Sequence, residues 1–459
     1  MAELTDLSAH EQVRRIKGRE VSARELLDAH LNRIDERNPE LNAIVALDTE
    51  IATRRAEAVD RALMNGDDPG ALAGLVTAHK DLTETKDFPT TYGSPVYADF
   101  RPDFDSLLVE RMAGAGAVAL GKTNTPEFGA GSHTFNQVYG VTRNAFNPDR
   151  SAGGSSGGAA VALASGMVAI ADGSDLGGSL RNPAAWNNIV GFRSSIGVLP
   201  ETGTQNPYVK FGITGAMGRT VDDMALLLSV LAQPDRRDPI NRGLEVPAHI
   251  TPSSGRVRVA WSTSLGGLPI EPEIVTVVHG LLATCEALGW EVVEAEPDFS
   301  GADEAFETLR SWSIANDGLI GRRPQGTSEF KEALQDEVRR GRDLSGADIH
   351  RALRQTKTLW ARAISFFGDV DLMIAPVTQV SPFPVDVEYP TEIEGMPMER
   401  YITWMRSASR VTQMGLPALS LPAGFTAAGL PVGAQLIGAP RDDLRLLAFA
   451  KSLEQARRS

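Results

Sequence analysis

Residues 151–200 read SAGGSSGGAAVALASGMVAIADGSDLGGSLRNPAAWNNIVGFRSSIGVLP and decide most of the fold. Two serines in this stretch, Ser155 and Ser179, stand 24 residues apart, and each follows a Gly-Gly pair. Between them, residues 157–164 are small and helix-like, and residues 167–171 are typical of a buried strand. Because glycine permits close backbone approach, this helix and strand can return the second serine beside the first. We therefore expect a functional site at the two glycine-framed serines.

A strand upstream supplies a candidate base for these serines. Residues 75–78 are apolar and lead into Lys80 and Asp81. The segment GGSSG at residues 153–157 also fits the nucleophile-elbow pattern, which requires a histidine base later in the chain. The downstream histidines lie in a proline-flanked loop or in helix-like stretches; they are His249, His279 and His350. Lysine is therefore the natural base, and the alternative for Lys80 is a surface side chain paired with Asp81.

The rest of the chain predicts an α/β architecture. After a helical stretch over residues 1–65, where Ser22 and Glu25 form a capping-box pattern, short apolar runs alternate with glycine-rich turns and helices. Further strands are expected at residues 117–120, 372–375, 418–421 and 433–437, and further helices at 106–112, 307–368 and 441–455. We expect one large α/β domain over residues 1–459, with a buried sheet that takes strands from both halves of the chain.

The composition excludes several classes of function. The 459 residues carry 45 Lys and Arg against 59 Asp and Glu, which gives a net charge of −14 at pH 7. Proteins that bind nucleic acid through its phosphates normally carry the opposite sign, so we expect no nucleic-acid partner. The N-terminus lacks an apolar signal segment and no apolar run reaches the ~18 residues of a membrane span, so we expect a cytoplasmic protein without membrane contact. The single cysteine, Cys285, permits no internal disulfide, and we expect it to be buried and inert.

Two further motif matches are weaker. Residues 116–123, GAVALGKT, fit the phosphate-loop pattern G-x-x-x-x-G-K-[ST], but their apolar interior predicts a strand where that pattern requires a loop. A phosphate-binding protein is the function that this segment would indicate. Residues 328–331, SEFK, fit the pattern S-x-x-K, but no K-T-G partner follows them. We expect neither segment to carry the chemistry.

The glycine-serine segment resembles the amidase signature family, whose members hydrolyse amide bonds with a Ser–cisSer–Lys triad. The resemblance rests on GGSSGG at residues 153–158, on D-x-GGS-x-R-x-P from Asp175, and on GKTNTPEF and LPALSLPAGFTAAGLPVGAQLIG elsewhere. It implies an α/β fold, an α/β/α sandwich around a large mixed β-sheet, with no cofactor, no metal and, as in many members, a homodimer. The chain then divides into an N-terminal helical layer (1–65), a signature core (70–232), a variable helical region (236–365) and C-terminal strands with a helix (370–457).

Carried over residue by residue, the resemblance assigns three catalytic residues. Ser179 matches the nucleophile that forms an acyl-enzyme, Ser155 the proton relay, and Lys80 the general base. The family geometry also implies a cis peptide bond before Ser155. A lysine base must be neutral, and burial can lower its ordinary pKa of about 10.4 by several units. One departure is His79, which stands where the family has an aliphatic residue; we expect it to pack, and a catalytic role is the alternative.

The resemblance also implies the groups around the triad. The oxyanion would contact four backbone amides, those of Leu176, Gly177, Gly178 and Ser179. Ser156 is expected to support Lys80 through a hydrogen bond. Asp175 and Arg181 are expected to orient the nucleophile loop, with an ordinary structural ion pair as the alternative. Gly129 matches a position whose carbonyl meets the substrate amide.

The leading function is hydrolysis of a small-molecule carboxamide or anilide by a stand-alone enzyme. The same family contains the A subunit of glutamyl-tRNA amidotransferase, but residues 181–186 (RNPAAW) and 200–215 look more like the free amidases. Hydrolysis of carbamates, cyclic amides or esters by the same triad, and a silent scaffold that kept the fold, are further alternatives. We expect the pocket walls in residues 128–139, 200–215 and 307–320, including Trp312.

Overall fold

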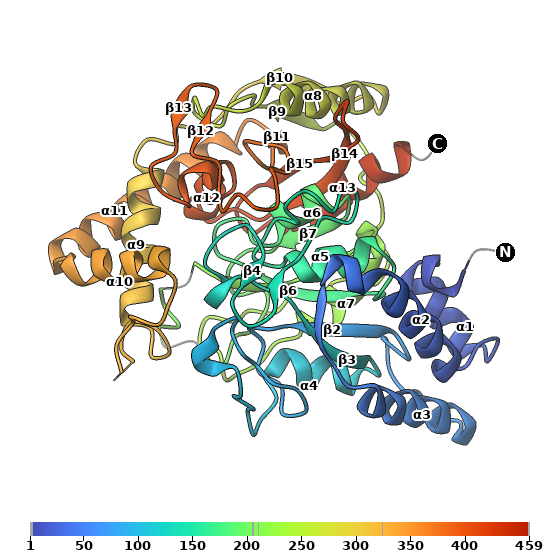
Figure 1. The fold of residues 1–459 in the computed structure, drawn as a ribbon. Coiled ribbons are helices and arrows are strands. Elements are labelled where there is room, and N and C mark those ends of the chain that lie inside the picture. The colour runs from blue at the N-terminus through green and yellow to red at the C-terminus, as the bar shows by residue number, and fades with distance from the viewer. Residues whose placement is uncertain (1–2, 204–205, 210, 324, 458–459) are drawn as a thin grey trace.

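The computed structural model describes residues 3–203, 206–209, 211–323 and 325–457. Across these ranges a large mixed sheet has the strand order β10-β9-β11-β15-β14-β7-β8-β6 (Figure 1). Its strands are β6 (Ala171–Asp175), β7 (Val190–Arg193), β8 (Ile213–Gly218), β9 (Arg258–Trp261), β10 (Glu291–Glu294), β11 (Leu372–Pro376), β14 (Ala418–Phe425) and β15 (Pro431–Gly438). Neighbours among β10, β9 and β11 are parallel, and the other neighbours are antiparallel. Both halves of the chain therefore contribute strands, as predicted.

Helices cover both faces of this sheet, so the fold is the predicted α/β/α sandwich. On one face α13 (Asp443–Ala456) contacts α7 (Val221–Leu231) and α8 (Pro272–Ala287), and on the other α5 (Gly157–Ala164) contacts α6 (Arg181–Trp186). Two glycines of β15 distinguish the faces. A Cβ on Gly433 would meet Ala185 of α6, whereas a Cβ on Gly438 would meet Leu446 of α13. Because these glycines are an odd number of residues apart, they face opposite sides of the strand.

A second, three-stranded sheet lies beside β6 and carries the candidate base. Its order is β1-β3-β2, from β1 (Ile44–Leu47), β3 (Val118–Thr123) and β2 (Val76–Lys80). β2 runs parallel to β3 and packs against the segment that leads into β6, where Ala169 N donates to Val76 O at 2.9 Å. Lys80 is the last residue of β2, so this packing delivers its side chain to the start of the large sheet.

The N-terminal helices follow the prediction except for one strand. They are α1 (Ala9–Lys17), α2 (Ala23–Leu41) and α3 (Thr49–Asn65), and Ser22 and Glu25 form the expected capping box at α2. The expectation of a helical stretch over residues 1–65 is wrong at residues 44–47, which form a strand. Asn42 adopts a left-handed conformation that ends α2, and the following residues pair with β3 as β1.

Two other expectations concern the phosphate-loop match at residues 116–123 and the strand expected at residues 167–171. Residues 118–123 form β3, and α4 (Leu107–Gly114) precedes this strand instead of following it, which is the reverse of a phosphate loop. The strand expected at residues 167–171 begins only at Ala171, where pairing with Met217 starts. The apolar residues before it are buried because they cross from α5 to β6 against β2.

The expectation of a helical region over residues 236–365 is wrong at β9 and β10, which belong to the large sheet. The later part of this range forms a group of helices beside the sandwich, drawn in yellow to orange in Figure 1. We call α9 (Ala302–Asn316), α10 (Glu332–Asp343) and α11 (Gly346–Phe366) the helical cap; α9 contacts the other two and also α12 (Arg406–Gln413). The remaining elements are β4 (Phe135–Asn136), β5 (Gly140–Val141), β12 (Glu392–Ile393), β13 (Met396–Pro397) and 3-10 turns at Leu4–Asp6, Pro95–Tyr97, Glu127–Gly129 and Thr403–Met405. Among the helices of the described ranges, none has the length and apolarity that crossing a membrane requires. Cys285 is buried on α8, and burial raises the pKa of its thiol to about 12, as expected of an inert cysteine.

Candidate active site

A pocket of about 340 Å³ has six of the predicted site residues on its wall: Gly129, Ser155, Asp175, Leu176, Gly177 and Ser179. Ser155 lies in the loop before α5, and Ser179 follows β6. The two serine loops are joined directly, because Ser156 N donates to Ser179 O at 3.1 Å. The predicted return of the second serine to the first is therefore observed.

Lys80 reaches the serine loops from the end of β2 and is buried, with 1% of its surface exposed. Its Nζ lies 2.7 Å from Ser155 Oγ, 2.9 Å from Ser156 Oγ and 2.9 Å from Ser174 Oγ. Burial lowers the pKa of this amine to about 7, although two buried carboxylates nearby act in the opposite direction. The alternative of a surface lysine is wrong, and the amine can exchange a proton near neutral pH.

Crowding around Ser155 explains the glycines that precede it. The Gly154–Ser155 peptide bond is cis, as the resemblance implied. Gly153 has a φ of +74°, and a Cβ at this position would lie 2.9 Å from Pro183 Cα. Ser132 Oγ donates to Gly154 O at 2.6 Å and fixes the turn from outside. No larger residue fits at Gly153 without moving the backbone that presents Ser155.

Four backbone amides are expected to face an oxyanion. Three of them belong to residues that line the pocket, and the fourth donates its N–H to another group. Within the described ranges, the N–H groups of Leu176, Gly177 and Ser179 have no acceptor in the protein, and these residues line the pocket. Gly178 N instead donates to Asp175 Oδ1 at 2.8 Å. The expectation for Gly178 therefore needs correction: its N–H compensates a buried carboxylate and is not directed at the pocket.

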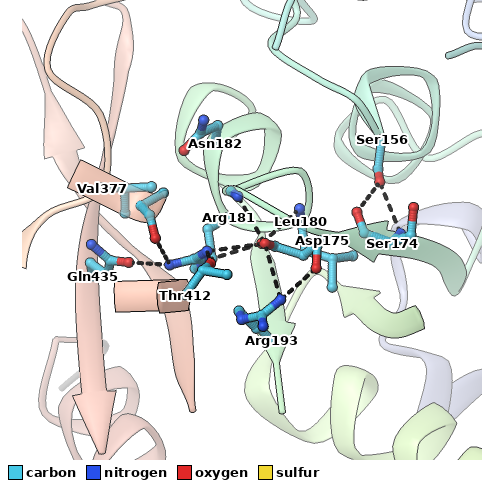
Figure 2. A network of polar contacts seen from close by, with 12 residues as sticks. Ser156, Ser174, Asp175, Leu180, Arg181, Asn182, Arg193, Val377, Thr412 and Gln435 are labelled. Atoms are coloured by element: carbon cyan, nitrogen blue, oxygen red, sulfur yellow. Dashed lines mark hydrogen bonds and ion pairs between the residues drawn. The ribbon is translucent and has the colours of Figure 1, made fainter. Parts of the chain in front are cut away.

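Asp175 is the centre of a buried polar network behind the nucleophile (Figure 2). Arg181 contacts both of its carboxylate oxygens at 3.0 Å, and Arg193 lies 3.6 Å away. Burial alone would raise the pKa of Asp175, but the two guanidinium groups outweigh it and hold the pKa well below the ordinary range. Arg181 also donates to Gln435 Oε1 at 2.6 Å and to Thr412 Oγ1 at 2.9 Å. The pair thus anchors the nucleophile loop to β15 and α12, which fits the predicted orienting role.

Two contacts of the base strand were not anticipated from the sequence. Ser174 completes the ring of hydroxyls around Lys80, and Asp172 accepts a hydrogen bond from His79 Nδ1 at 2.8 Å. His79 is buried and does not line the pocket, in keeping with its expected packing role. The alternation of side chains along a strand could have indicated both contacts. Asp172 and Ser174 are two residues apart in β6, so their side chains share the face toward β2.

The pocket walls come from the three predicted segments and from one helix face. Lining residues include Phe128 to Gly131, six residues of the described part of 200–215, and several from α9. On α9 the lining residues follow one helical face: Phe306, Arg310, Ser313 and Ile314. Trp312 falls between these positions and does not line the pocket, so that expectation is wrong. Leu82, Leu334 and Met405 also line it, outside the predicted segments.

Comparison with known proteins gives the same picture across nearly the whole chain. The family model described as Amidase matches residues 25–447. An acylamidase from Rhodococcus erythropolis is 34% identical over 458 residues, which cover 98% of this chain and 95% of that protein. The A subunit of the glutamyl-tRNA(Gln) amidotransferase from Thermosynechococcus vestitus is 32% identical over 475 residues, covering 96% of each chain. The crystal structure of a bacterial aryl acylamidase superposes with a TM-score of 0.90 at 29% identity, covering 98% of this chain and 96% of that one.

The sandwich fold and the serine loops around a buried lysine define the class of this protein as an amide hydrolase. The chain belongs to the amidase signature family.

Proposed function

We propose that this protein hydrolyses a carboxamide C–N bond through a seryl acyl-enzyme, with Ser179 as nucleophile, Ser155 as proton relay and Lys80 as general base. The observation that carries the proposal is the 2.7 Å contact between Lys80 Nζ and Ser155 Oγ on the wall of a pocket that also holds Ser179. A neutral amine has two donors and one lone pair. With three hydroxyl partners around Nζ, the lone pair can accept the Ser155 proton while the N–H groups donate to Ser156 and Ser174.

Each step of the reaction then has an assigned group. Ser179 Oγ attacks the carbonyl carbon, its proton passes to Ser155 Oγ, and the Ser155 proton passes to Lys80 Nζ. The carbonyl oxygen becomes an oxyanion that accepts hydrogen bonds from the free amides of Leu176, Gly177 and Ser179. When the C–N bond breaks, the proton returns from Lys80 through Ser155 to the leaving nitrogen. Water then attacks the acyl-enzyme and gives its proton through Ser155 to Lys80, and the proton returns through Ser155 to Ser179 Oγ as the ester C–O bond breaks.

The pocket wall favours an amide with an apolar or aromatic group. Phe128, Phe211 and Phe306 contribute rings to the wall, next to the serine loops. Gly129 lies against the relay, since a Cβ at that position would be 3.3 Å from Ser155 Oγ. Gly129 is therefore close enough to the relay to contact a bound substrate amide. We infer that linear anilides or alkyl amides are the substrate class, consistent with the acylamidase name of one relative.

The test uses covalent labelling, because it needs no knowledge of the natural substrate. A fluorophosphonate probe is expected to label the purified chain at Ser179, identified by mass spectrometry of the digested protein. Ser179→Ala is expected to abolish labelling. Ser313→Ala, which removes another serine of the same pocket wall, is the matched control and should label normally. Labelling of Ser179→Ala at the wild-type rate would overturn the nucleophile assignment.

A second candidate function is that of one chain in a tRNA-dependent amidotransferase complex. The 32% identity with such a chain over 96% of both sequences supports it. The two candidates differ in what the protein needs: an amidase hydrolyses amides alone, whereas a chain of the complex requires its partners. Assaying the purified chain against p-nitroanilides and primary amides, with its particle mass measured by sedimentation, distinguishes them. Turnover by a monomer or homodimer supports the amidase.

A further inference from the structure

The strand that carries the base and the strand that leads to the nucleophile belong to different sheets, so no ladder of backbone hydrogen bonds registers them. Where β2 meets β6, Thr77 Oγ1 donates to Ile170 O at 3.0 Å. Closer to the site, His79 Nδ1 lies 2.8 Å from Asp172 Oδ1. This second contact joins the residue next to the base with the strand that continues into the nucleophile loop.

Asp172 is an ionised carboxylate in a fully buried position. It accepts hydrogen bonds from His79, from the Lys80 backbone N–H at 3.2 Å and from Thr83 Oγ1 at 3.1 Å. Burial by itself would raise the pKa of Asp172, but His79 and the other donors, with Lys122 nearby, outweigh it and lower the pKa. The negative charge is therefore retained beside the base strand, where it attracts a proton onto Lys80.

We propose that His79 and Asp172 form a buried positioning pair, which ties the base strand to the nucleophile strand and sets the charge of the Lys80 amine. The inference rests on the proposed function, since it assigns the pair a role through Lys80. The contact depends on the side chain at position 79. With an aliphatic side chain there, Asp172 would lose its side-chain donor on β2, so the histidine and the buried carboxylate belong together.

The charges around Lys80 give the direction of each effect. The negative charges of Asp172 and Asp175 on β6 both act on the amine, and Asp175 is paired with two arginines. Asp172 has His79 on β2 as a hydrogen-bond donor and the Lys122 amine on β3 as a nearby positive charge, and Lys122 also acts on Asp81. While Asp172 stays ionised, removing the His79 hydrogen bond leaves its negative charge less compensated beside Lys80 and raises the Lys80 pKa. Removing the Asp172 charge lowers that pKa.

The experiment is the pH dependence of fluorophosphonate labelling at Ser179. In wild type the rate should rise through pH 7 as Lys80 loses its proton. His79→Leu is expected to move this midpoint up, and Asp172→Asn to move it down, each by ~1 pH unit. Opposite shifts from the two partners of one contact cannot arise from loss of packing alone.

Two controls keep the result interpretable. His79→Asn places a donor near the position of Nδ1 and should restore most of the wild-type midpoint. His30→Leu removes another buried histidine, which contacts Gly166 O at 3.0 Å far along the chain, and should change stability without moving the midpoint. Coincident midpoints, or shifts in the same direction, in His79→Leu and Asp172→Asn would overturn the proposal. If His79→Leu does not fold, an Asp172→Asn midpoint equal to that of wild type would by itself overturn the proposal. Failure of the wild type to label at Ser179 would instead refute the proposed function.

Discussion

Two regions of the molecule solve different problems with different kinds of sequence. The first, which we call the floor, comprises β2, β6 and the loops that carry Ser155 before α5 and Ser179 before α6. Its polar side chains are buried and each has several partners, as Lys80 and Asp175 do. The helical cap, α9 to α11, presents one face to the pocket and carries exposed ion pairs such as Arg340 with Asp336 on its other faces.

The difference teaches where the chemistry and the selectivity reside. In the floor, backbones approach so closely that side chains are excluded: a Cβ on Gly158 would lie 2.4 Å from Asn124 N. Almost every floor position is thus constrained by its neighbours. The cap needs only an amphipathic helix of the right length, so its pocket residues can change without disturbing Lys80 and the serine loops. We expect substitutions in the floor to affect the reaction with every substrate, and substitutions in the cap to affect the choice among substrates.

The largest expected effect is that of the base itself. Lys80→Met keeps most of the buried volume but removes the proton acceptor, and labelling of Ser179 should fall by ~10²- to 10⁴-fold. Because burial lowers the pKa of Lys80 to about 7, the wild-type rate should decline below pH 7, where the amine is protonated. The variant should lose this dependence. Labelling rates measured between pH 5.5 and 9 test both points.

Stability provides the control for that variant. The folded pKa of Lys80 lies below its unfolded value, so the unfolded chain binds the extra proton between those two values. Burying the lysine therefore opposes folding at neutral pH, and Lys80→Met should unfold at a higher urea concentration than wild type. A variant that is less stable, or that labels with the wild-type pH profile, would contradict the assignment of Lys80 as a neutral buried base.

The next prediction compares the stability lost when a buried ion pair of the floor is broken with the stability lost when an exposed ion pair of the cap is broken. Arg181→Met leaves the fully buried Asp175 with Arg193 as its remaining cation and should lower the free energy of unfolding by ~3 to 5 kcal/mol. Arg340→Met removes a half-exposed partner of Asp336 and should cost no more than ~1 kcal/mol. Urea unfolding of both variants measures the difference. Equal losses would show that the floor network is no more important for folding than a surface pair.

The floor could be predicted from the sequence because its structural constraints are local and each requires an unusual pattern of residues. The two Gly-Gly-Ser motifs, the helix at residues 157–164 and the apolar run before Lys80 each mark one unusual requirement. The boundaries were less certain where two sheets compete for one segment. Residues 167–170 are apolar because they cross β2, and sequence periodicity alone does not separate such a crossing from a paired strand.

What could not be predicted depends on contacts between distant segments. The partner of Gly178 N is Asp175, a choice that follows from the need to compensate a buried charge and not from the glycine itself. The partner of His79 lies on another strand, and only the pairing of the two sheets brings Asp172 to it. In the cap, the sequence analysis placed Trp312 in the pocket wall. Helical spacing instead puts Phe306, Arg310 and Ser313 on the pocket face.

The smallest effect tests the division between floor and cap with two aromatic residues of one helix. Phe306 lines the pocket above the nucleophile loop, where a Cβ on Gly177 would lie 2.8 Å from its Cζ, whereas Trp312 faces away from the pocket. Phe306→Ala should lower kcat/KM for a hexanoyl p-nitroanilide by about 10-fold, mostly through KM, because it removes apolar contact with the substrate. The acetyl analogue is too short to use that contact and should lose less. Trp312→Ala should leave both values near wild type. An equal loss for the two anilides would place Phe306 with the floor, since a residue needed for the reaction itself cannot distinguish them.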